Sequence, residues 1–343
     1  MDRRLILSVA GSGKTTFLIG QLDENKKFLI VTYTDNNVAN IRTRIIKKFG
    51  YFPNNITLLS YYQFLIRICY RPFLKDKIRA KGITWTMPDA KLKIPKVSPL
   101  FYLTKSKYLY HNRIALLCET YCRDDIRERI EHFYDALLFD EVQDLGGRDF
   151  NLVQAILPKT IDVILVGDFF QHTFDTSKDG KTNSTLYDDY TKYINRWSGI
   201  GINVDTQTLS CSYRCSPEIC EKVRNDLGIN IESHRRDSSS IIFVDNQNEA
   251  DELYKDDTKV KLFFQDSSKY NCQAINWGAS KGLDNLKDVC IVLNKTTLSY
   301  YQSGNLKALE ASTKNKLYVA FTRARGDVSL IPHTYIDKYK MNK

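Results

Sequence analysis

Short apolar runs alternate with amphipathic segments of helical length along most of the chain. The first runs predict strands at 5–9, 28–32, 57–60, 136–139 and 161–166. The segments behind them predict helices that start near Lys14, end at Phe49 and cover 61–69. A second series predicts a helix from Ser216 and strands at 208–210, 240–244, 260–264, 272–275, 289–293 and 328–331. Strands and helices that alternate in this way predict an α/β fold with parallel sheets.

The two series predict two domains. We expect a first domain over 1–200, a second over 201–335 and a tail over 336–343, with the domains meeting near 195–207. The first domain carries an insertion at about 71–134, and the polar stretch 175–185 reads as a loop. A length of 343 residues provides enough material for two cores.

Composition agrees with a soluble protein: 43% of residues are apolar and 26% are charged. No apolar run approaches the roughly 20 residues that cross a bilayer. The first predicted strand starts so early that we expect no signal peptide, and the eight scattered cysteines fit free thiols in a reducing cytoplasm.

Most of the net charge of +10 lies in one segment. Residues 71–113 contain eleven lysines and arginines against two acids, a net charge of +9. Aromatic residues are interleaved with these cations, as suits a polyanion with stackable bases. The alternative is a solvated basic surface whose aromatic rings pack inward. The lysines that we predict to contact nucleic acid are Lys91, Lys93, Lys96, Lys105 and Lys107.

A glycine-rich turn with Lys-Thr follows the first strand. The backbone N–H groups of Gly11, Ser12 and Gly13 can surround a phosphate, Lys14 can reach the β- and γ-phosphates, and the Thr15 hydroxyl can bind Mg²⁺. Ser8 stands where the usual pattern has its first glycine. The alternative is a strand-to-helix turn without special chemistry.

Two carboxylates close the apolar strand at 136–139. Asp140 can hold Mg²⁺, and Glu141 can orient or deprotonate an attacking water. An acidic loop that caps the next helix is the alternative reading. The pairing of strand-Gly-Lys-Thr with strand-Asp-Glu is more specific than either motif alone, because both must meet one Mg·ATP.

These motifs, with others in matching order, resemble superfamily 1 helicases of the UvrD/Rep type. The resemblance extends from residue 5 to about 330 and includes the phosphate loop Ala10–Thr16. The other matching segments are 31–42, 59–64, 140–144, 166–171, 212–216, 281–284 and 317–324. It implies two RecA-like P-loop domains with an ATP cleft between them, and ATP and Mg²⁺ as cofactors.

The resemblance also implies roles for single residues. Gln171 would sense the γ-phosphate, while Arg214 and Arg323 would act as arginine fingers; surface ion pairs are the alternative for the arginines. Tyr213 would stack on adenine, and Asp284 would bond the ribose. The residues expected along the nucleic-acid strand are Tyr33, Thr34 and Phe174, although the aromatic ones could equally be core residues.

Several positions depart from the family pattern. No glutamine segment precedes the phosphate loop, and Gly278 replaces a common histidine. Thr176 and Ser177 stand where the family has a base-stacking tryptophan and an arginine. The spacing between Arg214 and Lys281 leaves no room for the large second-domain insertion.

Two functions therefore stay open. One is an ATP-dependent translocase or helicase on single-stranded nucleic acid, 3′→5′ on DNA by resemblance. The other is a nucleic-acid-stimulated ATPase that switches a partner protein, such as a nuclease in an antiphage system. The cysteine spacings 211/215/220 and 118/122 lack a tight metal-binding knuckle and favour buried thiols over zinc or an iron–sulfur cluster.

Overall fold

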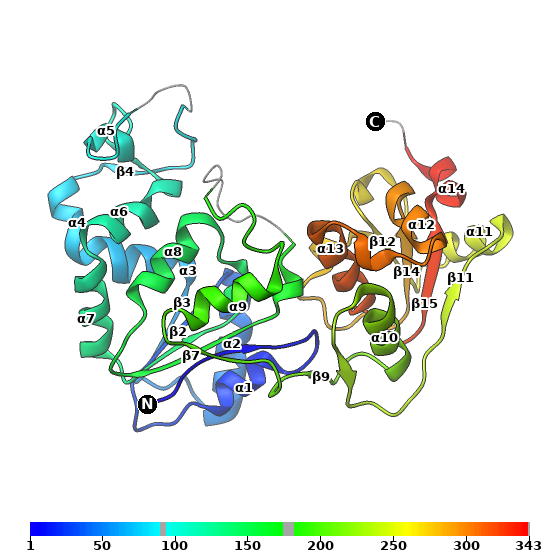
Figure 1. Ribbon diagram of the computed structural model, residues 1–343, viewed down its shortest axis with the longest axis horizontal. Coiled ribbons are helices and arrows are strands. Elements are labelled where there is room, and N and C mark those ends of the chain that lie inside the picture. The colour runs from blue at the N-terminus through cyan, green and yellow to red at the C-terminus, as the bar shows by residue number, and fades with distance from the viewer. Residues whose placement is uncertain (90–93, 174–181, 342–343) are drawn as a thin grey trace. The chain divides into compact units, whose positions relative to one another are not determined.

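The computed structural model describes residues 1–89, 94–173 and 182–341 (Figure 1). Contacts divide the chain into two compact units. Unit 1 holds residues 1–6, 15–167 and 175–205, and unit 2 holds residues 7–14, 168–174 and 206–343. Lys91, Lys93, Phe174, Thr176 and Ser177 lie outside the described residues, as does most of the stretch 175–185.

The sheet of unit 1 has the strand order β3-β2-β6-β7-β1-β8. Its strands are β1 (Arg3–Leu7), β2 (Phe28–Thr32), β3 (Ile56–Ser60), β6 (Ala136–Phe139), β7 (Asp162–Gly167) and β8 (Asn203–Asp205). β2 pairs in parallel with both β3 and β6, β6 with β7, and β1 with β8. Every residue of β2 and β6 is buried, as expected for central strands that helices cover on both faces.

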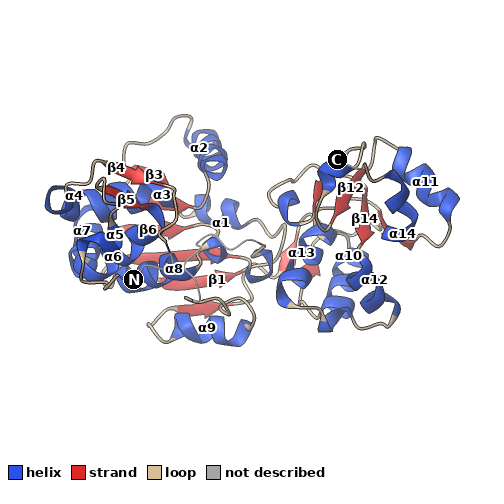
Figure 2. Ribbon diagram, turned by 90° about the horizontal axis from the view of Figure 1, so that it is seen from above, coloured by secondary structure: helices blue, strands red, loops and turns tan. Residues whose placement is uncertain are grey.

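Helices connect these strands and cover the sheet (Figure 2). They are α1 (Lys14–Gly20), α2 (Asp35–Phe49), α3 (Tyr61–Phe64), α8 (Gly147–Ile156) and α9 (Tyr190–Ser198). Local sequence fixes the ends of α2. The Thr34 hydroxyl accepts a hydrogen bond from the Asn37 N–H at 3.2 Å, and Gly50 ends the helix with a left-handed φ of 83°.

The insertion lies between β3 and β6. A wider helical turn over Leu65–Tyr70 continues α3 and leads into it. Its elements are α4 (Arg71–Ile78), β4 (Gly82–Thr84), α5 (Pro99–Tyr102), β5 (Tyr108–Tyr110), α6 (Ile114–Tyr121) and α7 (Arg123–Phe133). β4 and β5 form a separate two-stranded parallel sheet that pairs Gly82 with Tyr108 and Thr84 with Tyr110.

Unit 2 contains a five-stranded parallel sheet in the order β11-β15-β14-β12-β13. Its strands are β11 (Ile241–Phe243), β12 (Val260–Phe263), β13 (Ala274–Asn276), β14 (Val289–Leu293) and β15 (Val328–Pro332). A second, two-stranded sheet joins β9 (Cys211–Ser212) and β10 (Glu232–Ser233). The helices are α10 (Pro217–Lys222), α11 (Gln247–Lys255), α12 (Lys295–Gln302), α13 (Ala311–Phe321) and α14 (His333–Ile336).

The core of unit 2 includes the fully buried Trp277, which donates a hydrogen bond from Nε1 to the Leu262 carbonyl at 2.9 Å. Near the C-terminus, Tyr339 stacks on Tyr254 with ring centroids 3.9 Å apart, and Lys338 forms an ion pair with Asp251 at 2.6 Å. The last described residues therefore pack on α11.

The predicted α/β class with parallel sheets is confirmed. One local prediction is wrong: residues 208–210 form no strand, because the pairing with β10 starts only at Cys211. The stretch 195–207, where we expected the domains to meet, contains the end of α9 and the division between the units at 205/206. It also contains the unpredicted strand β8, whose short, mixed sequence Asn203-Val204-Asp205 lacks an apolar run yet pairs with β1. No helix in the described part of the chain is both long and apolar enough to cross a membrane.

Trp197 on α9 provides a test of the unit 1 core. It is fully buried and packs edge-to-face on Phe150, with ring centroids 5.1 Å apart. We expect Trp197→Ala to lower the free energy of unfolding by about 3–5 kcal/mol, because it leaves a large cavity. Chemical denaturation followed by circular dichroism measures this loss. The nearby Ile200→Ala should change stability by less than about 0.5 kcal/mol, because Ile200 is 37% exposed. Equal midpoints for the two variants would contradict the packing.

Candidate nucleotide site

The loop between β1 and α1 has a backbone that requires glycine. Gly11 and Gly13 have φ values of +72° and +86°, in the left-handed region that side chains disfavour. Close packing adds a second reason at Gly11. A Cβ there would lie 2.6 Å from the Arg214 Cβ and 2.8 Å from the Ser212 Oγ. The Tyr213 N–H donates to the Gly11 carbonyl at 2.9 Å, so the loop lies directly against residues 212–214 within unit 2.

The same loop carries a polar group without a partner. The Ser12 Oγ is buried and makes no hydrogen bond, and a Cβ built on Gly13 would meet nothing within 4 Å. A buried hydroxyl without a partner is costly unless a ligand or water satisfies it. An open, glycine-lined loop with such a hydroxyl fits a bound anion such as phosphate.

Tyr318 on α13 connects this loop to the predicted motif segment 166–171, through Asp168. Its buried hydroxyl accepts the Ala10 N–H at 2.8 Å and donates to Asp168 Oδ2 at 3.0 Å. Burial, together with the neighbouring Asp168 carboxylate, raises the pKa of Tyr318 well above its ordinary value, so the proton stays on the hydroxyl. The N–H of Ala10, the first residue of the predicted phosphate loop, is therefore engaged by Tyr318.

Arg214 and Arg323 lie close together and share one carboxylate. Arg214 forms an ion pair with Asp284 Oδ1, and one Arg323 Nη lies 3.9 Å from the same oxygen. Arg323 is 1% exposed, whereas the Asp284 side chain is 53% exposed. Burial, followed by the repulsion of Arg214, lowers the pKa of Arg323 to about 10. Two guanidinium groups thus face a single, half-solvated anion.

Backbone carbonyls hold the two arginines in place. Arg214 Nη1 donates to the Thr322 carbonyl at 3.1 Å, and Arg323 Nη1 donates to the Leu283 carbonyl at 3.2 Å. Carbonyl dipoles orient a guanidinium but leave its net charge uncompensated. A phosphate beside these side chains would supply the missing negative charge.

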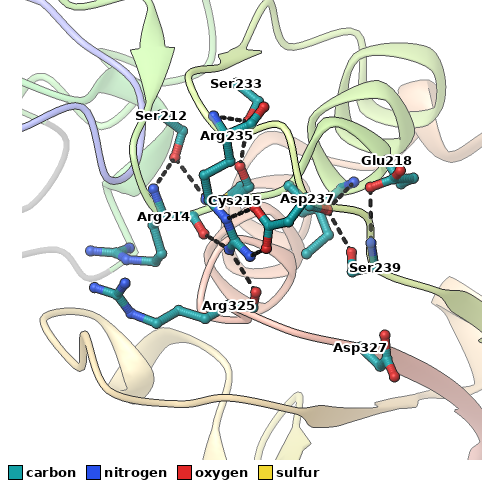
Figure 3. Close-up of polar contacts among 12 residues, drawn as sticks. Ser212, Arg214, Cys215, Glu218, Ser233, Arg235, Asp237, Ser239, Arg325 and Asp327 are labelled. Carbon is teal, nitrogen blue, oxygen red and sulfur yellow. Dashed lines mark hydrogen bonds and ion pairs between the residues drawn. The ribbon is translucent and has the colours of Figure 1, made fainter.

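Arg235 links the chain segments that carry Arg214 and Arg325, as Figure 3 shows. Its Nη1 donates to the Arg214 carbonyl and, at 2.6 Å, to the Arg325 carbonyl. Asp237 pairs with the same guanidinium, and its contact with Nε is 2.8 Å long. The sequence did not single out Arg235, since it lies in a polar stretch outside every matching motif. Its position becomes clear only from the residues that it contacts in the folded chain.

The residues that we predict to bind Mg²⁺ and the attacking water lie in unit 1. The Thr15 Oγ1 donates to Asp140 Oδ2 at 3.0 Å, although 125 positions separate the two residues. A hydroxyl and a carboxylate side by side are the oxygen ligands that Mg²⁺ takes beside phosphate. The residues present therefore fit the predicted metal. Among the described residues, no group of three or more His, Cys, Asp or Glu side chains could hold a metal ion.

Glu141 follows Asp140 in a strained conformation. Its φ of 57° and ψ of 43° are left-handed, a region that costs a non-glycine residue about 1–3 kcal/mol. The Glu141 N–H donates to Asp140 Oδ1 at 3.0 Å, and Gln143 Nε2 donates to the Glu141 carboxylate. Gly167 at the end of β7 leaves room for this turn, because a Cβ there would lie 2.5 Å from Gln143 Oε1.

The remaining predicted site residues take separate places. Gln171 is buried, and its N–H donates to the Asp168 carbonyl at 2.9 Å. Thr16 accepts a hydrogen bond from Arg44 at 3.1 Å. Tyr213 is 61% exposed and stacks on His234 with ring centroids 4.0 Å apart. An exposed ring in that position can accept an adenine.

The described residues that we predict to contact nucleic acid lie in unit 1. Tyr33 stacks on Tyr61 with centroids 6.1 Å apart, and Thr34 is exposed as the cap of α2. Lys96, Lys105 and Lys107 are exposed on the insertion. The described cysteines are free thiols.

Comparisons with known proteins bear on the fold. No protein-family model and no curated protein matches the chain. The structure of arterivirus nonstructural protein 10 (helicase) with DNA is similar, with a TM-score of 0.50 and 11% identity over 96% of this chain and 60% of that one. The PRRSV helicase gives a TM-score of 0.47 and 13% identity over 98% of this chain and 54% of that one. This chain therefore spans between 54% and 60% of the length of these helicases. The likeness to the arterivirus protein shows that this chain shares the fold of that protein, and it confirms the expected α/β architecture.

Replacing Tyr318 by phenylalanine tests the buried link. Tyr318→Phe keeps the ring but leaves the Ala10 N–H and an Asp168 oxygen without this partner. We expect a loss of about 1–3 kcal/mol in the free energy of unfolding, because the buried Ala10 N–H loses the hydroxyl that accepts its hydrogen bond. Tyr335→Phe is the control, since its hydroxyl donates to the Asp245 carbonyl at an exposed site where water can replace it. Matching urea midpoints for both variants would refute the link.

Proposed function

We propose that the chain hydrolyses ATP in response to single-stranded nucleic acid and uses the energy to move along the strand, as a helicase or translocase. The hydrogen bond between Thr15 and Asp140 carries the proposal. It joins the end of the phosphate loop to the acidic turn behind β6. Both residue types are needed at one Mg²⁺. The expected subtype is UvrD/Rep-like, with DNA as the strand and 3′→5′ movement.

In this mechanism Lys14 and the loop amides bind the phosphates, while Thr15 and Asp140 hold Mg²⁺. The metal would neutralise the charge that develops on the phosphate oxygens. Glu141 orients the attacking water and accepts its proton. Its left-handed backbone and its hydrogen bond from Gln143 fix the direction of the carboxylate.

Charge supports the roles of Arg214 and Arg323. Both cations are held by carbonyls, and they share only the half-exposed Asp284 carboxylate. A triphosphate would favour the protonated state of Arg323, whose pKa burial lowers to about 10. The two guanidinium groups would then stabilise the transferring phosphoryl group, as arginine fingers do.

Exposed cations on the insertion support a nucleic-acid strand as the activating ligand. Eight described lysines and arginines of the segment 71–113 are exposed: Arg71, Lys75, Lys77, Arg79, Lys81, Lys96, Lys105 and Lys107. The similar arterivirus helicase was determined with DNA.

One sequence feature favours a second function. Thr176 and Ser177 replace a base-stacking tryptophan and an arginine of the UvrD-type pattern, which weakens the strand track. An ATPase that switches a partner protein, such as a nuclease, needs strand sensing but not processive unwinding.

Two assays on the same preparation separate these functions. ATP hydrolysis is titrated with single strands, duplexes and forks of DNA and RNA, and displacement of a labelled strand is followed in parallel. A motor gives strand-stimulated hydrolysis with displacement, whereas a switch gives stimulated hydrolysis alone. Hydrolysis that no nucleic acid changes would contradict both.

Variants of the nucleotide residues test the chemistry. We expect Lys14→Ala and Glu141→Gln to abolish turnover, and Arg323→Ala to slow it by about 10³-fold or more. The matched control is Arg236→Ala, an exposed arginine of the same unit that lies outside the site. Steady-state phosphate release measures the rates, and circular dichroism checks that each variant is folded. Wild-type turnover in any of the three variants would refute its assigned role.

Removing three exposed cations tests the insertion. We expect the change of Lys96, Lys105 and Lys107 to Gln to weaken single-strand binding and to lower the slope of log K against log salt by up to about 2, at about 0.7 per lost phosphate contact. The control changes Lys255, Lys295 and Lys307 of unit 2, which are equally exposed and remove the same charge. Fluorescence anisotropy at several salt concentrations gives both slopes. An equal fall in both triple variants would show only a general charge effect.

A further inference from the structure

A small pocket with aromatic walls lies where the insertion meets the sheet of unit 1. It has a volume of about 180 Å³ and is lined by Tyr33, Tyr61, Tyr62, Leu65, Trp85, His111, Asn112 and Asp149. Drug-sized ligands occupy pockets of about 300–1,000 Å³, so this one accommodates a single ring system. Tyr61 and Tyr62 lie on α3, while Trp85 and His111 directly follow β4 and β5; Figure 2 shows these three elements grouped in one part of the unit.

The register of the small sheet builds one wall. Because Thr84 pairs with Tyr110, the next residues, Trp85 and His111, come side by side, with ring centroids 4.6 Å apart. His111 is fixed in place by a 3.2 Å hydrogen bond between Nδ1 and the Thr84 carbonyl. Tyr62, on α3, extends the row with a centroid 5.4 Å from Trp85.

These rings face solvent rather than a core. Trp85 is 65% exposed and Tyr62 is 36% exposed, whereas Trp197 and Trp277 are fully buried. A tryptophan side chain that stays in water does not gain the free energy that burial of its apolar surface would provide. Rings held in this way offer a flat ligand a surface for stacking.

Polar groups at the pocket give it a chemical preference. The Asn112 Oδ1 is buried and has no hydrogen-bond partner. The Tyr61 hydroxyl donates a hydrogen bond to Asp149 Oδ1 at 2.8 Å. Both groups accept hydrogen bonds. A flat ligand that presents N–H donors along its edge matches rings and acceptors together.

We propose that this pocket binds one unstacked base of a single-stranded nucleic acid, with the base on the Trp85–Tyr62 wall and its donor edge toward Asn112 and Asp149. The proposal rests on the nucleic-acid response described above. Guanine is the preferred base, because its amino group and ring N–H are neighbouring donors. The exposed lysines of the same insertion would hold the adjoining phosphates.

The position of Trp85 makes the test direct. Of the three tryptophans in the chain, it alone has a ring in solvent, so stacking of a base should quench its fluorescence. Homopolymeric oligonucleotides of about 10 bases, within the usual site size, are titrated into the full chain. We expect quenching by all of them, with oligo-dG or a thymine strand containing one guanine binding more tightly than plain oligo-dT.

Variants separate stacking from charge. Trp85→Ala should weaken binding about 5- to 150-fold in anisotropy assays, the range typical for loss of one base stack. Trp85→Phe should retain most of the affinity but lose the quenching, and Asn112→Leu should remove the preference for guanine. The control Phe133→Ala removes a 48% exposed aromatic ring at the end of α7 and should change neither.

The outcomes distinguish this proposal from the proposed function. If no oligonucleotide binds at any salt concentration, the nucleic-acid function itself fails. If oligonucleotides bind and stimulate hydrolysis but Trp85→Ala binds like the wild type, only the base pocket is overturned. Equal affinity for all bases in wild type and Asn112→Leu would overturn the donor-edge preference.

Discussion

A single buried hydroxyl fixes the position of the loop between β1 and α1. The Tyr318 Oη satisfies the Ala10 N–H and the Asp168 carboxylate at once, in surroundings where no water competes. The two loops that it joins follow β1 and β7, which are neighbours in the six-stranded sheet. Because α13 also carries the chain to Arg323, the position of the loop and that of the buried cation depend on the same helix. A shift of α13 would therefore alter both.

Few groups offset the repulsion between the two buried arginines of unit 2. Arg214 and Arg323 are close enough to repel each other, and the Asp284 carboxylate offsets only part of this repulsion. Arg235, paired with Asp237, bonds the Arg214 and Arg325 carbonyls and so fixes the backbone next to both arginines (Figure 3). The expected role of Asp284 at the ribose stays a prediction. Its observed contact is with the arginines, for which an arriving phosphate would compete.

Sequence patterns predicted much of this chain because buried parallel strands are continuous apolar runs. β2, β6 and β14 were visible for that reason, and the motif spacing predicted that Thr15 and Asp140 would meet. β8 was missed because a short edge strand needs little burial; its only apolar residue is Val204. Arg235 and the Trp85 pocket were missed for another reason. Their partners come from distant segments, and no local pattern marks a pairing register or a bond to a backbone carbonyl.

The left-handed backbone at Glu141 has a consequence for how the protein could be stabilised. Glycine at this position would relieve the strain and keep the turn, so a variant without the carboxylate could outlast the native chain on heating. Selection for folding stability alone would then favour variants that lack the Glu141 carboxylate. Such a gain in stability would remove the carboxylate that the proposed function assigns to the attacking water.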